Sequence, residues 1–173
     1  MNGMKDEMFD SSLISRFQKE IEPGYVLRPL QMNDHQNGYL DLLSQLTSVG
    51  DVDDEWFEKR FISMRDTNPK AYYVVVLADE KNDRIVASAT LVIEWKFIHQ
   101  AGCRGRVEDV VVDEQLRGKK IGSLLNRILV HLAQQIGVYK LSLECKDKLI
   151  PFYESFGYKK DEGNNFLVQR FDH

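Results

Sequence analysis

The clearest pattern in the chain is a set of apolar residues that recur every three to four positions between residues 121 and 136. They are Ile121, Leu124, Leu125, Ile128, Leu129, Leu132 and Ile136. This spacing is typical of an amphipathic helix that buries one face. Gly137 follows, and glycine is the residue that most often ends a helix. The pattern predicts a helix over 121–136.

Three stretches before this helix are rich in the β-branched and aromatic residues that favour strands. They are 71–78, 85–95 and 106–112, and polar segments at 80–84 and 96–104 separate them. Connections of this kind join neighbouring antiparallel strands. We therefore predict one antiparallel meander.

Shorter patterns account for the rest of the chain. Helices are expected after Asp10 or Ser11, after Asn33-Asp34 and after Asp53, because polar residues of these types cap helices. Further strands are expected at 25–30, 138–145 and 166–171, and a short helix at 150–156 has Pro151 near its first turn. We expect an N-terminal arm at 1–22 and a single domain at 23–173. This order predicts an α+β (mixed α/β) fold in which helices cover a sheet.

Composition narrows the class of protein. The 173 residues are 43% hydrophobic, and 23 Lys and Arg against 27 Asp and Glu leave a net charge of −4. Such a chain can hold a core, and the acidic balance argues against a bulk nucleic-acid binder. No apolar run approaches the ~20 residues of a membrane span. With two cysteines and no CxxC pair, we expect a cytoplasmic protein without a bound metal.

Small and basic residues gather at the start of the predicted helix. The segment reads Arg117-Gly-Lys-Lys-Ile-Gly122. The first N–H groups of a helix have no internal partner, and glycines let an anion approach them closely. A phosphate or pyrophosphate site and a solvated basic helix start explain this pattern about equally well. The P-loop and GxGxxG motifs are both absent from the sequence.

Two adjacent carboxylates, Glu108 and Asp109, interrupt the apolar strand at 106–112. Neighbouring residues of a strand point to opposite faces, so one carboxylate would face a packed side. An unpaired buried carboxylate is costly, and such a residue usually has a partner or a chemical role. We favour a functional role over a bulge or edge position that lets both side chains reach water.

The chain resembles the GNAT acetyltransferase superfamily at two of these segments. Residues 117–122 resemble its acyl-CoA pyrophosphate loop, [QR]-x-x-G-x-[GA], with Lys120 in place of the middle glycine, and 151–158 (PFYESFGY) resemble the segment after its fifth strand. The resemblance implies the GNAT fold, whose central sheet is mixed, mostly antiparallel and flanked by helices. It also implies acetyl-CoA contacts at Val110, Val111, Val112, Arg117, Gly118, Lys119, Lys120, Ile121, Gly122, Ser123 and Tyr153.

Four segments resemble the glucosamine 6-phosphate N-acetyltransferases within that superfamily: 94–112, 46–50, 139–145 and 168–170. The resemblance implies an enzyme that transfers the acetyl group of acetyl-CoA to the amine of D-glucosamine 6-phosphate. The transfer would be a direct attack in a ternary complex, on the route to UDP-N-acetylglucosamine. It further implies a homodimer that exchanges its C-terminal strand.

The same resemblance gives roles to individual residues. Tyr153 would protonate the departing CoA thiolate, because tyrosine has a reference pKa of about 10 and keeps its proton at neutral pH. Glu108 or Asp109 would orient the amine or accept its proton. Substrate contacts are expected at Thr47, Lys96, Phe97, Ile98, His99, Glu108, Asp109, Glu144 and Arg170. For Arg104 and Arg106 we favour solvated surface charges.

One residue departs from the family pattern, and two other functions stay open. Leu149 stands where the family often has an asparagine that contacts the CoA arm, so this contact is missing or is replaced, for example by Lys146 or Lys148. The open functions are acetylation of a protein or other small amine, and acyl-CoA binding without catalysis. A substrate without phosphate separates the acceptors, because only a phosphosugar needs Lys96 and Arg170.

Overall fold

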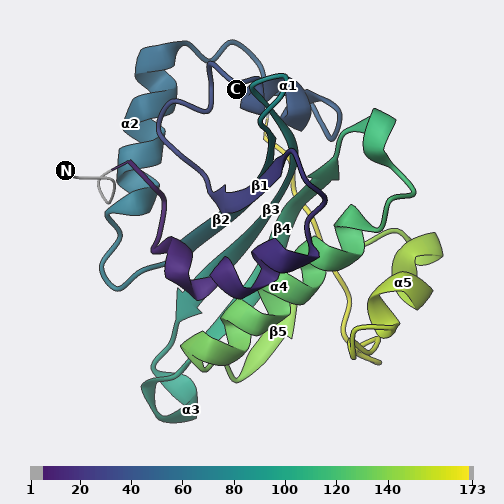
Figure 1. Cartoon of the computed structure of the whole chain (residues 1–173). Helices are drawn as coiled ribbons and strands as arrows, with labels where there is room; N and C mark the ends of the chain where they lie inside the picture. The colour runs from purple at the N-terminus through teal and green to yellow at the C-terminus, as the bar shows by residue number, and fades with distance from the viewer. Residues whose placement is uncertain (1–5, 172–173) are drawn as a thin grey trace.

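A five-stranded sheet with the order β1-β2-β3-β4-β5 forms the centre of the computed structural model, which describes residues 6–171 (Figure 1). The strands are β1 (Tyr25–Pro29), β2 (Tyr72–Asp79), β3 (Arg84–Trp95), β4 (Cys103–Val112) and β5 (Lys140–Ser142). The first four pair antiparallel in chain order, and β5 runs parallel to β4. The predicted meander is confirmed.

Five helices accompany the sheet. They are α1 (Tyr39–Ser44), α2 (Asp54–Arg65), α3 (Ile98–Ala101), α4 (Ile121–Ile136) and α5 (Ile150–Glu154), with short 3-10 turns at 11–13, 15–20, 114–116 and 147–149. The residues of α4 are those that the periodicity predicts, and Gly137 follows in the left-handed conformation. Because α4 joins the parallel strands β4 and β5, it crosses one face of the sheet, where it packs on β3 and β4.

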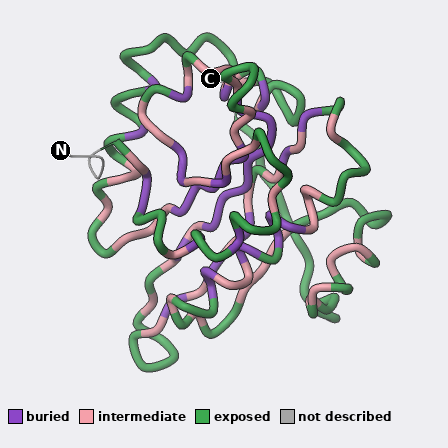
Figure 2. The backbone as a smooth tube through the Cα atoms, in the orientation of Figure 1, coloured by how far each residue is buried: buried purple, intermediate pink, exposed green. Residues whose placement is uncertain are grey.

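The buried core lies between the sheet and the elements that cover it, which are α4, the N-terminal arm, α1 and α2. β2 and β3 are buried along most of their length, which explains why their sequences are almost continuously apolar (Figure 2). From α4 the fully buried side chains are Leu125, Ile128, Leu129 and Leu132. No helix among residues 6–171 is long and apolar enough to cross a membrane.

The arm contributes to this core, although it forms two 3-10 turns rather than one regular helix. Met8 and Ile14 are almost completely buried, and Phe17 packs edge-on against the ring of His131 in α4. The carboxylate of Asp10 caps the first turn by accepting from the N–H of Ser12 at 2.9 Å. Residues 1–5 of the predicted arm lie outside the described residues.

Three predicted elements differ from the structure. The helix expected from Asn33-Asp34 begins only at Tyr39, because the Asp34 carboxylate binds Arg28 (2.8 Å) and the N–H of Gln31 (2.7 Å) instead of capping a helix. The strand expected at 138–145 is limited to Lys140–Ser142, since pairing with β4 stops there.

The strand predicted at 166–171 is wrong for the single chain. Residues 159–171 belong to no helix or strand, and they are exposed throughout. A strand needs a neighbour for its N–H and C=O groups, and these residues pair with no other described segment. The apolar side chains of Phe166, Leu167, Val168 and Phe171 are therefore open to solvent.

Candidate active site

The two halves of β4 differ in their pairing. At Arg104–Arg106 the strand pairs with β3 on one side and with β5 on the other. Ser88 of β3 then pairs with Val111, whereas Thr90 pairs with Glu108, so Asp109 and Val110 both stand opposite Ala89. This is a β-bulge on β4. Asp109 takes a left-handed backbone conformation there (φ 50°), which aspartate tolerates better than most residues.

Beyond the bulge, β4 and β5 separate. A continued parallel register would place Leu143 and Glu144 opposite Val107 and Glu108, but the pairing ends at Ser142. The outer backbone edge of 108–112 consequently has no strand partner within residues 6–171. We call this opening, bounded by 108–112 and by 143–145, the β4–β5 split. Its backbone N–H groups remain available to a ligand.

The bulge also decides where the two carboxylates lie. Glu108 is 40% exposed at its side chain, and Asp109 is an exposed residue. The expectation that strand alternation buries one of them is therefore wrong, because the extra residue breaks the alternation. The carboxyl group of Asp109 is still partly shielded from water. This shielding and, second, the negative charge of Glu108 raise the pKa of Asp109.

Arg106 links the carboxylates across the β4–β5 split. Its Nε lies 3.0 Å from Glu108 Oε1, and its other end binds Glu144 beyond β5. Arg104 binds Glu94 at 2.7 Å. The interpretation of both arginines as solvated charges is wrong, since each has a carboxylate partner. The structure brings Glu108, Asp109 and Glu144 to one place.

The loop before α4 has the geometry of an anion site. Gly118 (φ 87°) and Lys120 (φ 62°) take left-handed conformations that turn the chain into the helix. The first helical bond runs from Leu124 N to Lys120 O, so in the described chain the N–H groups of Ile121, Gly122 and Ser123 lack acceptors. These groups and three exposed basic side chains can hold phosphate. The basic residues are Arg117, Lys119 and Lys120.

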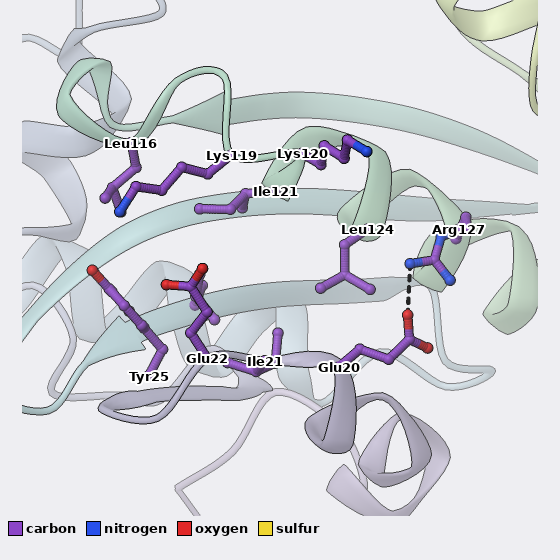
Figure 3. Close-up of a pocket in the computed structure, with 11 residues that line it drawn as sticks. Glu20, Ile21, Glu22, Tyr25, Leu116, Lys119, Lys120, Ile121, Leu124 and Arg127 are labelled. Atoms are coloured by element: carbon purple, nitrogen blue, oxygen red, sulfur yellow. Dashed lines mark hydrogen bonds and ion pairs between the residues drawn. The ribbon is translucent and has the colours of Figure 1, made fainter.

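A pocket of about 160 Å³ adjoins this loop on the side of α4 that faces β1 (Figure 3). Lys119 extends over it toward Glu22 and Tyr25, whereas Lys120 points away. Glu20 and Arg127 form an ion pair of 2.7 Å at its edge. Since β1 and β5 are opposite edges of the sheet, this pocket is separate from the β4–β5 split. The two lysines of the loop thus have different surroundings.

Tyr153 lies on α5, beyond β5. Its ring packs edge-on against Phe152 (5.0 Å between centroids) and Tyr158 (5.9 Å). Burial and, second, the neighbouring Cys145 raise the pKa of Tyr153, so the phenol keeps its proton more firmly than a free tyrosine. Leu149 precedes α5 and is 39% exposed.

The remaining predicted site residues come from the β3–β4 turn, from the segment after α1 and from the C-terminal segment. Phe97 is fully exposed at the β3–β4 turn, where His99 stacks on Tyr139 at 3.9 Å and has a left-handed backbone. The N–H of Lys96 donates a hydrogen bond to the carbonyl of Gly102, so Lys96 lies beside Gly102. Gly102 precedes Glu108 by six residues, which separates the two backbones by roughly 20 Å along a strand. The other members of this group are Ile98 (62% exposed), Thr47 after α1, and Arg170 in the exposed segment at 159–171.

Two residues near the site did not emerge from the sequence analysis. Tyr39 of α1 is buried, and its pKa is raised to about 12, first by burial and in smaller part by the charge of Asp109. Asn126 of α4 is buried beside the hydroxyl of Tyr158. A polar residue between Leu125 and Ile128, on the buried face of a helix, was the available signal for Asn126.

Comparison with known proteins identifies the family. Residues 33–158 match the model of the acetyltransferase (GNAT) family. A probable glucosamine 6-phosphate N-acetyltransferase of Drosophila melanogaster is 47% identical over 152 residues, which are 87% of this chain and 68% of that protein. The glucosamine 6-phosphate N-acetyltransferase of Arabidopsis thaliana is 35% identical over 133 residues, or 77% and 89%.

Solved structures agree with this assignment. The crystal structure of glucosamine-6-phosphate N-acetyltransferase from Arabidopsis thaliana has a TM-score of 0.77 at 33% identity, over 86% of this chain and 99% of that one. An acetyltransferase of Trypanosoma brucei has a TM-score of 0.74 at 31% identity, over 84% and 99%. The predicted fold is confirmed. The chain belongs to the GNAT family of acetyltransferases.

Proposed function

We propose that this chain is a glucosamine 6-phosphate N-acetyltransferase. It transfers the acetyl group of acetyl-CoA to the amine of D-glucosamine 6-phosphate and releases CoA and N-acetyl-D-glucosamine 6-phosphate. The observation that carries this proposal is the β4–β5 split, where two carboxylates directly precede an unpaired backbone edge. Relatives that bear this name, at 35% and 47% identity, support the choice of acceptor.

Acetyl-CoA occupies the loop and the open half of β4. The N–H groups of Ile121, Gly122 and Ser123 hold the pyrophosphate, and the basic side chains of the loop add positive charge around it. The thioester carbonyl accepts hydrogen bonds from N–H groups of 110–112, whose outer edge has no strand partner in the described chain. These donors stabilise the oxyanion that forms when the amine attacks.

Proton transfers complete the reaction. The sugar ammonium gives a proton to Asp109 or Glu108, and a carboxylate of raised pKa such as Asp109 accepts it more readily than an ordinary one. The amine nitrogen attacks the thioester carbon, a C–N bond forms, and the C–S bond breaks. Tyr153 gives its proton to the CoA thiolate, and the second proton, which the nitrogen loses as the amide forms, returns to the phenolate through solvent. No acyl-enzyme forms, so replacing Cys103 and Cys145 leaves the activity intact.

The phosphosugar site is completed by a second copy of the chain. Lys96 and His99 lie at the β3–β4 turn, too far from Glu108 of their own chain to contact the same sugar. The apolar side chains beside them, Trp95, Phe97 and Ile98, are exposed, and so are Phe166, Leu167, Val168 and Phe171. Exposed apolar groups of this kind mark contact surfaces. In a homodimer that exchanges 166–171 as a strand, the hairpin of one copy and Thr47, Glu144 and Arg170 converge on one substrate.

The two free cysteines support a cytoplasmic location for the enzyme, and the chemistry of its product supports a role on the route to UDP-N-acetylglucosamine. N-acetyl-D-glucosamine 6-phosphate is a precursor of UDP-N-acetylglucosamine. Cys103 is buried and Cys145 is exposed, and neither forms a disulfide. Free thiols persist in reducing compartments, so the enzyme works in the cytoplasm.

A thiol-release assay tests the reaction and the acceptor together. Acetyl-CoA is supplied with glucosamine 6-phosphate, with glucosamine or with a lysine peptide. We expect rapid release with the phosphosugar alone. Release with the peptide would instead favour protein acetylation. No thiol release with any of the three acceptors, despite CoA binding, would favour a non-catalytic module.

Mixing two inactive variants tests the composite site. Lys96→Ala and Tyr153→Phe are refolded together, so that half of the dimers are mixed and each mixed dimer has one intact site. We expect about a quarter of the wild-type rate. A mixture as inactive as its components would show that each site uses residues of one chain only.

A further inference from the structure

Asn126 carries a buried hydrogen-bond donor that no group in the described part of the chain uses. The residue is 1% exposed on the buried face of α4. Its Oδ1 accepts a hydrogen bond from the Tyr158 hydroxyl at 3.5 Å, and its Nδ2 has no partner among residues 6–171. Buried side-chain amides in folded proteins are almost always fully paired. An unpaired one on the otherwise apolar buried face of a helix therefore indicates a ligand.

The position of Asn126 on α4 indicates where that ligand lies. One helical turn separates Asn126 from Gly122, so the two residues share a face of α4. Gly122 belongs to the loop whose free N–H groups suit a pyrophosphate. On the other side, Tyr158 contacts Asn126 and packs against the ring of Tyr153, at 5.9 Å between centroids. The unpaired donor thus stands along the way from the pyrophosphate loop to the proposed proton donor.

The part of acetyl-CoA that spans this interval has matching chemistry. The pantetheine arm joins the pyrophosphate to the thioester, and it contains two amide groups whose carbonyl oxygens accept hydrogen bonds. We propose that Nδ2 of Asn126 donates a hydrogen bond to an amide carbonyl of the pantetheine arm of bound acyl-CoA. This inference rests on the use of acetyl-CoA in the proposed function, but it does not depend on the identity of the acceptor.

The contact gives Asn126 a second task besides holding Tyr158. Its Oδ1 accepts a hydrogen bond from the Tyr158 hydroxyl, and its Nδ2 donates to the arm. One amide therefore positions the thioester relative to the aromatic pair of Tyr158 and Tyr153. In the absence of acyl-CoA the same donor is buried without a partner, which lowers the stability of the free protein. Asn126 therefore increases the affinity for the arm and decreases the stability of the free protein.

The test compares Asn126→Leu with the unmodified protein by calorimetric titration of two ligands. Acetyl-CoA contains the arm, whereas adenosine 3′,5′-bisphosphate lacks it. We expect Asn126→Leu to bind acetyl-CoA about five- to tenfold more weakly. Its affinity for the bisphosphate should stay unchanged, and the melting temperature of the free variant should be equal or higher. An acetyl-CoA affinity within about twofold of wild type, or an equal loss for both ligands, overturns the proposal.

A matched variant separates the donor from the support of Tyr158. Tyr158→Phe removes only the hydroxyl that Asn126 Oδ1 accepts. We expect it to leave the dissociation constant of acetyl-CoA unchanged. If it weakens acetyl-CoA as much as Asn126→Leu, then Asn126 acts through Tyr158 and the proposed contact is wrong. Should Asn126→Leu fail to fold, Asn126→Ala gives the same comparison of ligands.

Failure of the proposed function would be distinguishable. A wild-type protein that binds acetyl-CoA through Asn126, but releases no thiol with glucosamine 6-phosphate, would overturn the acceptor and leave this inference intact. If the wild-type protein acetylates the phosphosugar and Asn126→Leu binds acetyl-CoA normally, the proposed function stands and the Asn126 contact is wrong.

Discussion

The two halves of β4 differ in their pairing: the first half is hydrogen-bonded on both sides, and the second half has an outer edge without a strand partner among residues 6–171, where we propose that acetyl-CoA binds. At Arg104–Arg106 the backbone is paired on both sides, and the charges are matched by Glu94, Glu108 and Glu144. Beyond Asp109 the strand is paired on one side only. The comparison teaches that reactivity arises here where hydrogen bonding within the sheet stops, because only unpaired N–H groups can serve a ligand.

Asp109→Asn should have the largest effect, because it removes a proton acceptor from the open half without changing its shape. Asparagine also tolerates the left-handed backbone at this bulge, so the fold should persist. We expect kcat to fall roughly 100-fold, measured by thiol release. Arg104→Gln in the paired half is the control, and it should keep kcat near the wild-type value. Equal losses in both variants would mean that the two halves do not differ in function.

Tyr153→Phe tests the proposed acid on α5, beyond β5. The variant keeps the ring that packs on Phe152 and Tyr158 but removes the proton for the thiolate. We expect kcat to fall roughly 100-fold, with the dissociation constant of acetyl-CoA unchanged. Phe152→Leu disturbs the same aromatic cluster without removing a hydroxyl, and it should affect stability more than kcat. An unaltered kcat in Tyr153→Phe would exclude the phenol as the acid.

The two halves should also respond to pH with opposite signs. Hydrogen bonds from Arg104 and Lys96 lower the pKa of Glu94 to about 2, so this residue stabilises the fold above its ordinary pKa, and that stability is lost as pH falls toward 2. Shielding and Glu108 raise the pKa of Asp109, so its ionisation destabilises the fold as pH rises between its ordinary and raised values.

Activity near Asp109 should follow its ionised form. The carboxylate accepts a proton only when charged, so kcat/KM falls as pH drops through the raised pKa of Asp109. A pH–rate profile together with thermal melts over the same range measures both effects. The acid limb of the residual activity should shift in Asp109→Asn. An identical limb in that variant would assign the titration to another group.

Leu149→Asn adds a polar atom at the start of α5. The exposed leucine offers no hydrogen bond to the CoA arm, so we expect the variant to bind acetyl-CoA roughly fivefold more tightly, as measured by titration calorimetry. Lys148→Gln is the companion variant. If Lys148→Gln loses affinity while Leu149→Asn gains none, the lysine already replaces the missing contact.

Lys120→Gly should have the smallest effect. Lys120 has a φ of 62°, which costs a residue with a side chain about 1 kcal/mol or more relative to glycine. We expect the free energy of unfolding to rise by roughly 0.5–1 kcal/mol, measured by urea denaturation. Lys119→Gly is a matched control because Lys119 is not left-handed. It should lower stability, and a gain in both variants would contradict the backbone explanation.

The elements with strong local patterns could be predicted from the sequence. The apolar period fixes α4 almost to the residue, and runs of β-branched residues mark β2 and β3. The basic glycine-containing loop and the carboxylate pair were also visible, because unusual residues in an apolar context are a local signal. Their joint placement in one site depends on the fold that the family resemblance implied.

The features that decide the site geometry depend on partners distant in the sequence. The bulge at Asp109 arises from the register between β3 and β4, while 106–112 alone reads as a regular strand. The sequence analysis treated Arg106 as a solvated charge, because its partner Glu144 lies 38 residues later in the chain, after β5. The strand expected at 166–171 has residues that favour strands but no strand neighbour among residues 6–171. In each case the local pattern was correct and the missing information was tertiary.

The packing of the arm has a consequence for the time course of synthesis. Phe9 packs on Tyr73, and Phe17 packs on His131, which is made 114 residues later. At ribosomal rates of about 5–20 residues per second, the partner of Phe17 is synthesised roughly 6–23 s after Phe17 itself. During this interval apolar side chains of the arm stay uncovered, so the nascent chain is a substrate for chaperones until α4 has left the ribosome.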